Sequence, residues 1–183
     1  MRVLLILLSL ILLMPSLFAF DGKRKGFVIG GGLGFSPYVS IKDGHYNDID
    51  MSYSSTSIAI NSHFGYAWDE NNQVVFEDSY AILDLEDEFG TTFSSAYAGP
   101  IWYHFFGSKG KAFYSAFGVG YYFFSENDGN YDHDQKTGVI FGAGYEFKRH
   151  FQLNLRYAYG KTDQNGWDYV HNHLNITVTG TFY

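Results

Sequence analysis

The chain has 183 residues, of which 46% are hydrophobic and only 17% are charged, and it carries 18 Phe, 16 Tyr and 3 Trp. This length suits one domain, and the absence of cysteine excludes a disulfide scaffold, a thiolate zinc site and a cysteine nucleophile. The formal net charge of -7 argues against nucleic acid as a partner, because nucleic-acid binders present a basic surface. We expect no cofactor and no nucleic-acid partner.

The first segment, 1–19, has the features of a secretory signal peptide. Arg2 supplies a positive charge, residues 3–13 form an apolar run, and Pro15 and Ala19 provide a breaker and a small residue at a plausible cleavage site. The apolar stretch is shorter than the roughly 20 residues that a membrane-spanning helix needs. We therefore predict a signal peptide over 1–19 and one β-barrel domain over 20–183.

Residues after the predicted signal peptide alternate with period two, which is typical of β-strands. The alternating runs are 27–41, 57–68, 74–83, 92–106, 112–124, 138–147, 151–159 and 173–182. The run 74–83 is the weakest, because its apolar face includes Asp78. A β-bulge at Glu77-Asp78 would turn both carboxylates off that face. With this run included, the sequence predicts eight strands.

One face of each run is rich in large apolar side chains, and the other is rich in Gly, Ser, Ala, Asn and Thr. A soluble barrel would need a charged exterior, yet the eight runs contain only Glu77, Asp78, Glu146 and Arg156 as charged residues. An apolar exterior around a small polar interior is typical of a membrane barrel. The sequence therefore predicts an all-β, eight-stranded antiparallel up-and-down transmembrane β-barrel.

In a membrane barrel the apolar face of each strand points outward, and this assigns every side chain to one face. We expect the larger apolar side chains to point outward, including Val39 and the set Tyr97, Ile101, Tyr103 and Phe105. We expect their strand neighbours to point inward, including Tyr38, Trp102 and His104.

Long and short connections alternate between the predicted strands, as in barrels with long extracellular loops and short periplasmic turns. The long connections are 42–52, 84–91, 125–136 and 161–170, and the short ones are 69–73, 107–111 and 148–150. The long connections hold 13 of the 19 acidic residues, and basic residues gather near the short turns. Asp69 and Glu70 depart from this trend.

The segment Gly142–Phe147, a short basic turn and the segment Phe151–Tyr157 resemble the penultimate hairpin of small outer-membrane barrels. The chain is similar to the OmpA/OmpX-like outer membrane β-barrel proteins of Gram-negative bacteria. The resemblance implies location in the cell outer membrane, contact with its lipids and lipopolysaccharide, and insertion by the barrel-assembly machinery. The terminal Tyr183 resembles the last residue that this machinery reads, although the outward alternation of the final run is in phase with Phe182.

Inward polar residues are the candidate site. Glu146 and Arg156 lie on adjacent predicted strands near one turn, so we expect them to pair and hold the barrel shut. The predicted lumen network comprises Glu146, Arg156, His63, His104, Asn154 and Trp102. Such a group could instead gate a pore, and its histidines serve the network rather than a metal.

Two chemical alternatives find little support. The loop 128–134 alternates oxygen-bearing side chains but has neither the glycine nor the final carboxylate of a calcium loop. Lipid A deacylases use a His-x-Ser pair, and the comparable stretch here is Tyr157-Ala158-Tyr159.

We therefore expect a non-enzymatic protein that supports the envelope or binds an unknown host or matrix surface through acidic loops. The alternatives are a narrow conduit for small or hydrophobic molecules and a lipid A-modifying enzyme.

Overall fold

The computed structural model describes residues 24–43, 52–84, 92–126, 134–164 and 167–183. The predicted signal peptide lies outside the described residues, as does most of the candidate calcium loop. The strands are β1 (Gly26–Asp43), β2 (Ser52–Ala67), β3 (Asn72–Asp84), β4 (Thr92–Phe106), β5 (Ala112–Glu126), β6 (Asp134–Gln135), β7 (Thr137–Lys148), β8 (Phe151–Gln164) and β9 (Trp167–Phe182). The described residues include no helix long and apolar enough to cross a bilayer.

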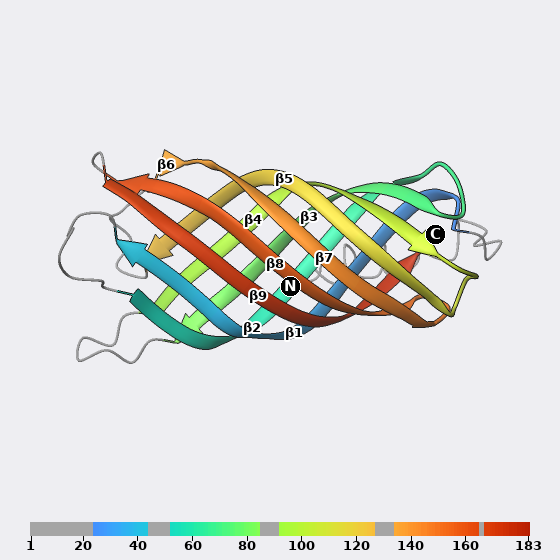
Figure 1. The fold of residues 1–183 in the computed structure, drawn as a ribbon, viewed down its shortest axis with the longest axis horizontal. Helices are drawn as coiled ribbons and strands as arrows, with labels where there is room; N and C mark the ends of the chain where they lie inside the picture. Colours follow the sequence, from blue (N-terminus) through green and yellow to red (C-terminus); the bar gives the residue numbers. More distant parts are fainter. Residues whose placement is uncertain (1–23, 44–51, 85–91, 127–133, 165–166) are drawn as a thin grey trace, which may run out of the picture.

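Eight long strands form one closed antiparallel barrel. Each pairs with its neighbour along the chain, and β1 pairs with β9 to close the sheet. The two-residue β6 lies just before β7 and pairs with β8. The strands run obliquely around a long cylinder, and β1 begins at the end where the C-terminus lies (Figure 1). The predicted eight-stranded up-and-down barrel is confirmed.

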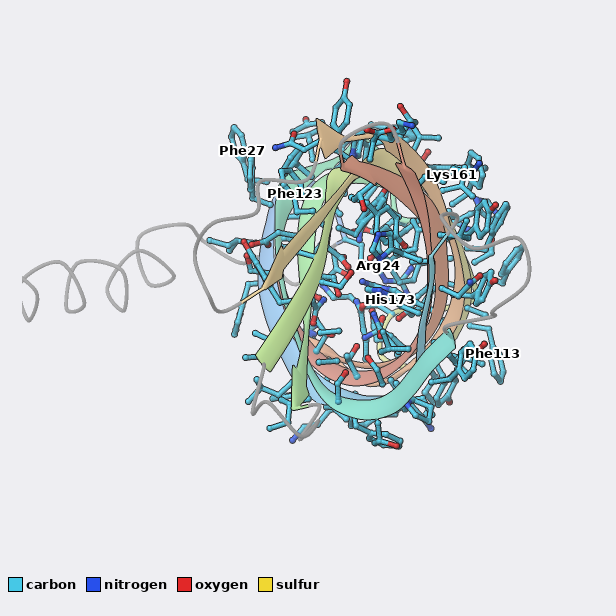
Figure 2. All side chains as sticks on the ribbon, turned by 90° about the vertical axis from the view of Figure 1, so that its left-hand side faces the viewer. Arg24, Phe27, Phe113, Phe123, Lys161 and His173 are labelled. Atoms are coloured by element: carbon cyan, nitrogen blue, oxygen red, sulfur yellow. The ribbon has the colours of Figure 1, made fainter. Side chains whose placement is uncertain are left out.

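The outer face carries the large apolar side chains. Phe27, Leu33 and Phe113 expose 75%, 66% and 67% of their surface, and Figure 2 shows Phe27 and Phe113 pointing away from the barrel. A contiguous apolar surface of this extent requires a hydrocarbon environment rather than water. The predicted orientation holds for β2, β5, β7, β8 and β9 along their described side chains.

The predicted orientation is wrong for β4. Tyr97, Ile101, Tyr103 and Phe105 are buried inside the barrel, whereas Trp102 lies on the outer face with 45% of its surface exposed. His104 shares that outer face. The glycines of the neighbouring strands explain the reversal, because they leave room that larger side chains must fill. A Cβ at Gly118, for example, would lie 2.7 Å from the side chain of Ile101.

The alternation in β1 breaks at a bulge between Ser36 and Val39. Pro37 lies within it, and proline is tolerated in sheets at such irregular positions. The extra residue reverses the faces that follow, so that Tyr38 is exposed and Val39 is buried. Both side chains therefore point opposite to the prediction.

The bulge proposed at Glu77-Asp78 is absent, because β3 keeps continuous register with both β2 and β4 there. Glu77 consequently points into the barrel, and Asp78 lies on the outer face. Ser62, its partner on β2, donates a hydrogen bond to the Asp78 carboxylate. This bond offsets part of the cost of a carboxylate on the lipid-facing surface.

The last predicted long connection, 161–170, is largely strand. β8 and β9 stay paired up to Gln164 and Trp167, which leaves only 165–166 between them. The short turns at the opposite end agree with prediction to within a residue or two. They connect β2 to β3, β4 to β5 and β7 to β8.

Candidate functional site: a polar network across the barrel interior

The centre of the interior is bridged by an ion pair between Glu77 of β3 and Arg156 of β8. Three strands separate β3 from β8 in either direction around the barrel, so the pair joins opposite walls. Glu77 is completely buried and Arg156 is 4% exposed. Two charges buried in this way need further hydrogen bonds to offset the cost of removing them from water.

Tyr103 of β4 completes the bridge. Its hydroxyl donates to Glu77 Oε2 at 2.8 Å and accepts a hydrogen bond from the Arg156 guanidinium. His63 of β2 adds a fourth strand, with Nδ1 4.0 Å from Glu77 Oε2. Side chains from β3, β4 and β8 thus bond to one another here, and the His63 ring of β2 lies beside them.

Asn154 extends the network toward the end with the short turns. Its amide oxygen accepts a hydrogen bond from Tyr114 of β5 and one of 3.3 Å from Arg156. Its amide nitrogen donates to Thr179 Oγ1 of β9 at 2.7 Å. Asn154 therefore connects strands on both sides of β8.

A second ion pair lies at the short-turn end. Arg24 precedes β1 and places its side chain inside the barrel, where Nε lies 3.2 Å from Glu146 Oε2 of β7. Its guanidinium lies 4.3 Å from the centre of the Phe105 ring, and its Nη1 donates to the Glu70 carbonyl at 2.6 Å. Figure 2, a view along the barrel, shows Arg24 within the ring of strands.

The acidic pair that departed from the predicted charge trend has a structural role in this region. Asp69 accepts hydrogen bonds from the Asn72 side chain and from the backbone of Asn71 and Asn72, and these bonds lower the pKa of Asp69. The Glu70 carboxylate accepts a 3.1 Å hydrogen bond from the Arg24 backbone. The turn between β2 and β3 therefore anchors Arg24, whose side chain enters the barrel just before β1.

Aromatic rings fill the interior toward the opposite end. The ring centres of Tyr97 and Tyr122 are 5.6 Å apart, and Tyr122 also contacts His171 and His173 at 5.8 and 5.6 Å. His171 in turn contacts Thr162 of β8 through a 2.7 Å hydrogen bond. Side chains from β4, β5, β8 and β9 thus meet at this level.

Close packing around Tyr122 gives a testable prediction. A Cβ at Gly160 would lie 2.1 Å from the Tyr122 ring, so Gly160→Ala should destabilise the barrel by about 1–3 kcal/mol through overpacking. Gly180→Ala is the control, because the nearest atom to its Cβ would be 3.9 Å away. Urea unfolding of both variants in lipid vesicles measures the difference, and equal stability would contradict the described packing.

The six residues predicted for the lumen network are distributed differently. Glu146, Arg156, His63 and Asn154 lie inside the barrel, whereas Trp102 and His104 lie outside it and both contact the Asn72 side chain. Glu146 and Arg156 do not pair with each other. Arg156 lies opposite Gly142 on β7, while Glu146 lies opposite Gln152 on β8.

Sequence reasoning missed three important members of the interior. The weak alternation of its run does not determine the face of Glu77, and the sequence predicts the wrong face for Tyr103. The pairing of Phe106 with Phe113 across a short turn was available as a signal, because paired residues share a face. Arg24 lies outside any alternating run, so periodicity gives no information about it.

A closed antiparallel barrel with an apolar exterior and an interior filled by polar and aromatic side chains is the architecture of a transmembrane β-barrel protein. The family model described as outer membrane protein beta-barrel domain matches residues 4–182 of this chain. The chain belongs to this family. It is located in an outer membrane of the kind that Gram-negative bacteria have. Among curated proteins, none matches the chain significantly.

Solved outer-membrane barrels share the fold at low sequence identity. Neisserial surface protein A is 15% identical, with a TM-score of 0.56 over 85% of this chain and 96% of that chain. OprG from Pseudomonas aeruginosa is 13% identical, with a TM-score of 0.51 over 88% and 99%. Ail, the attachment invasion locus protein of Yersinia pestis, is 15% identical, with a TM-score of 0.50 over 85% and 99%. These likenesses concern the fold alone.

Proposed function

We propose that the protein is a non-enzymatic surface protein, in which a closed barrel anchors acidic extracellular loops that bind a cationic partner. The observation that supports this most strongly is the Glu77–Arg156 pair, which joins opposite walls of the barrel. A second ion pair and an aromatic cluster cross the interior at other levels. A barrel filled in this way is a membrane anchor rather than a conduit, which is why we favour surface binding over transport.

The charge of the sequence supports the chemistry of the partner. The connections opposite the short turns, together with the adjoining strand ends, hold 13 acidic residues and only the lysines Lys42, Lys136 and Lys161. Most residues of these connections lie outside the described residues, and their excess of acidic residues is a property of the sequence. A surface with this excess of negative charge attracts basic proteins or peptides and repels polyanions.

Poly-lysine of defined length is a suitable probe for the full chain in phosphatidylcholine vesicles. We expect it to bind the wild-type protein and to dissociate as salt is raised, because screening weakens attraction between exposed charges. Replacing Asp84, Glu86, Asp87 and Glu88 by their amides should weaken binding severalfold.

The matched control replaces the exposed turn residues Lys111, Lys148 and Arg149 by glutamine, which changes charge at the other end of the barrel. This control should bind poly-lysine as the wild type does. Equal binding by the loop variant and the wild type would contradict the proposed role of the acidic loops.

A further inference from the structure

The outer face has an apolar depression of about 460 Å³ close to the short turns. It extends over β4, β5, β7 and β8, and its lining includes Phe106, Phe113, Ser115, Ala143, Tyr145 and Leu153. Small residues form its floor, since Ser115 and Ala143 are paired across β5 and β7. Phe113 and Tyr145, whose ring centres are 4.7 Å apart, border the floor on the turn side. The depression therefore has the shape of a groove that opens toward hydrocarbon.

Three exposed cationic side chains lie where this groove meets the turns. Lys111 lies two residues before Phe113, and Lys148 and Arg149 lie at the turn between β7 and β8. The two turns adjoin, because a Cβ at Gly110 would lie 3.3 Å from the Arg149 backbone nitrogen. The two turns that carry these cations thus lie side by side, next to the groove residues Phe113 and Tyr145 in the chain.

No carboxylate pairs with Lys111, Lys148 or Arg149, which we call the cationic rim, among the described residues. Glu146 is the carboxylate adjacent in the chain, but it is completely buried and pairs with Arg24. An anion at the membrane surface could therefore contact all three side chains without competition from that carboxylate.

We propose that this groove and the cationic rim bind one anionic glycerophospholipid of the periplasmic leaflet. An acyl chain occupies the groove, and the headgroup phosphate accepts hydrogen bonds from the lysines and the arginine. Short turns of bacterial barrels face the periplasm, which places the rim at the inner leaflet and away from lipopolysaccharide. This inference does not depend on the function proposed for the loops.

A second copy of the chain fits this surface less well. A twofold contact would bring the same patch of each copy together, so that three cations would face three cations. Such an arrangement is repulsive without an anion between the copies. Charge complementarity therefore favours a lipid as the occupant.

The test uses the full chain in nonionic detergent with either phosphatidylglycerol or phosphatidylcholine of identical acyl chains, and retained lipid is counted by native mass spectrometry. We expect phosphatidylglycerol to be retained in preference. Each Lys or Arg near an anionic lipid surface contributes about fivefold in affinity. The K111Q/K148Q/R149Q variant should therefore have an affinity for phosphatidylglycerol on the order of 100-fold lower than that of the wild type. Lys25→Gln is the control, because Lys25 is exposed beside β1, which lies away from the groove strands.

The groove is tested separately. Ala143→Phe fills its floor and should abolish retention, whereas Ala98→Phe adds the same group to the outer face away from the groove and should not. Inorganic phosphate serves as a probe for binding of a free anion. Equal retention of the two lipids, loss with Ala98→Phe as great as with Ala143→Phe, or tight binding of inorganic phosphate alone would each overturn the proposal.

Discussion

Glu77→Ala should lower the free energy of unfolding by about 3–5 kcal/mol, because it leaves the Arg156 guanidinium buried without its counterion. The same change removes the acceptor of the Tyr103 hydroxyl and the carboxylate beside His63. Urea unfolding in phosphatidylcholine vesicles measures the effect. Tryptophan fluorescence is a suitable signal, since Trp68 and Trp102 lie on the outer face and leave lipid on unfolding.

Asp78→Ala is the matched control for this prediction. It removes the neighbouring carboxylate of the same strand, but that carboxylate lies on the outer face, so the barrel should lose no stability comparable with that of Glu77→Ala. The double variant E77Q/R156M should recover part of the loss by removing both charges. Similar losses for Glu77→Ala and Asp78→Ala would show that the central ion pair does not stabilise the interior.

Arg24→Ala should also be strongly destabilising, by about 3 kcal/mol or more, because Glu146 would then be buried without its cation. The substitution also removes the contact of the guanidinium with the Phe105 ring and with the Glu70 carbonyl. The measurement is the same unfolding experiment, performed on the barrel in vesicles.

Lys25→Ala provides a control at the next position in the chain. Lys25 is exposed, and surface substitutions of this kind change stability by about 0.5 kcal/mol or less. If Arg24→Ala and Lys25→Ala proved equally mild, the segment before β1 would not be anchored inside the barrel.

Strand number, antiparallel order and the apolar exterior were predictable, because period-two alternation is clear in most of the eight long strands. The size of a side chain was a poor guide to its face in β4. Apolar residues occur on both faces of that strand, and Gly118 of β5 leaves interior space that the side chain of Ile101 occupies. The orientation of the β4 side chains depends on how they fit those of the neighbouring strands, and the periodicity of one strand carries no information about that fit.

The candidate site was predictable only in part. Glu146 and Arg156 were expected to pair because they are close to one turn, but the barrel places their partners elsewhere. Arg156 reaches across the lumen to Glu77, and Glu146 contacts a residue that precedes the first strand. Both contacts join residues far apart in sequence, and they arise only when the sheet closes on itself.

The central claim is that side chains close the barrel, and planar-bilayer recording of the full chain tests it most directly. Arg24 and Glu146, Glu77 and Arg156, and the Tyr97–Tyr122 cluster bridge the interior at successive levels. We predict that the inserted wild-type protein shows no steady ionic conductance. A stable, reproducible conductance from the folded wild-type barrel would contradict the account and would favour a conduit.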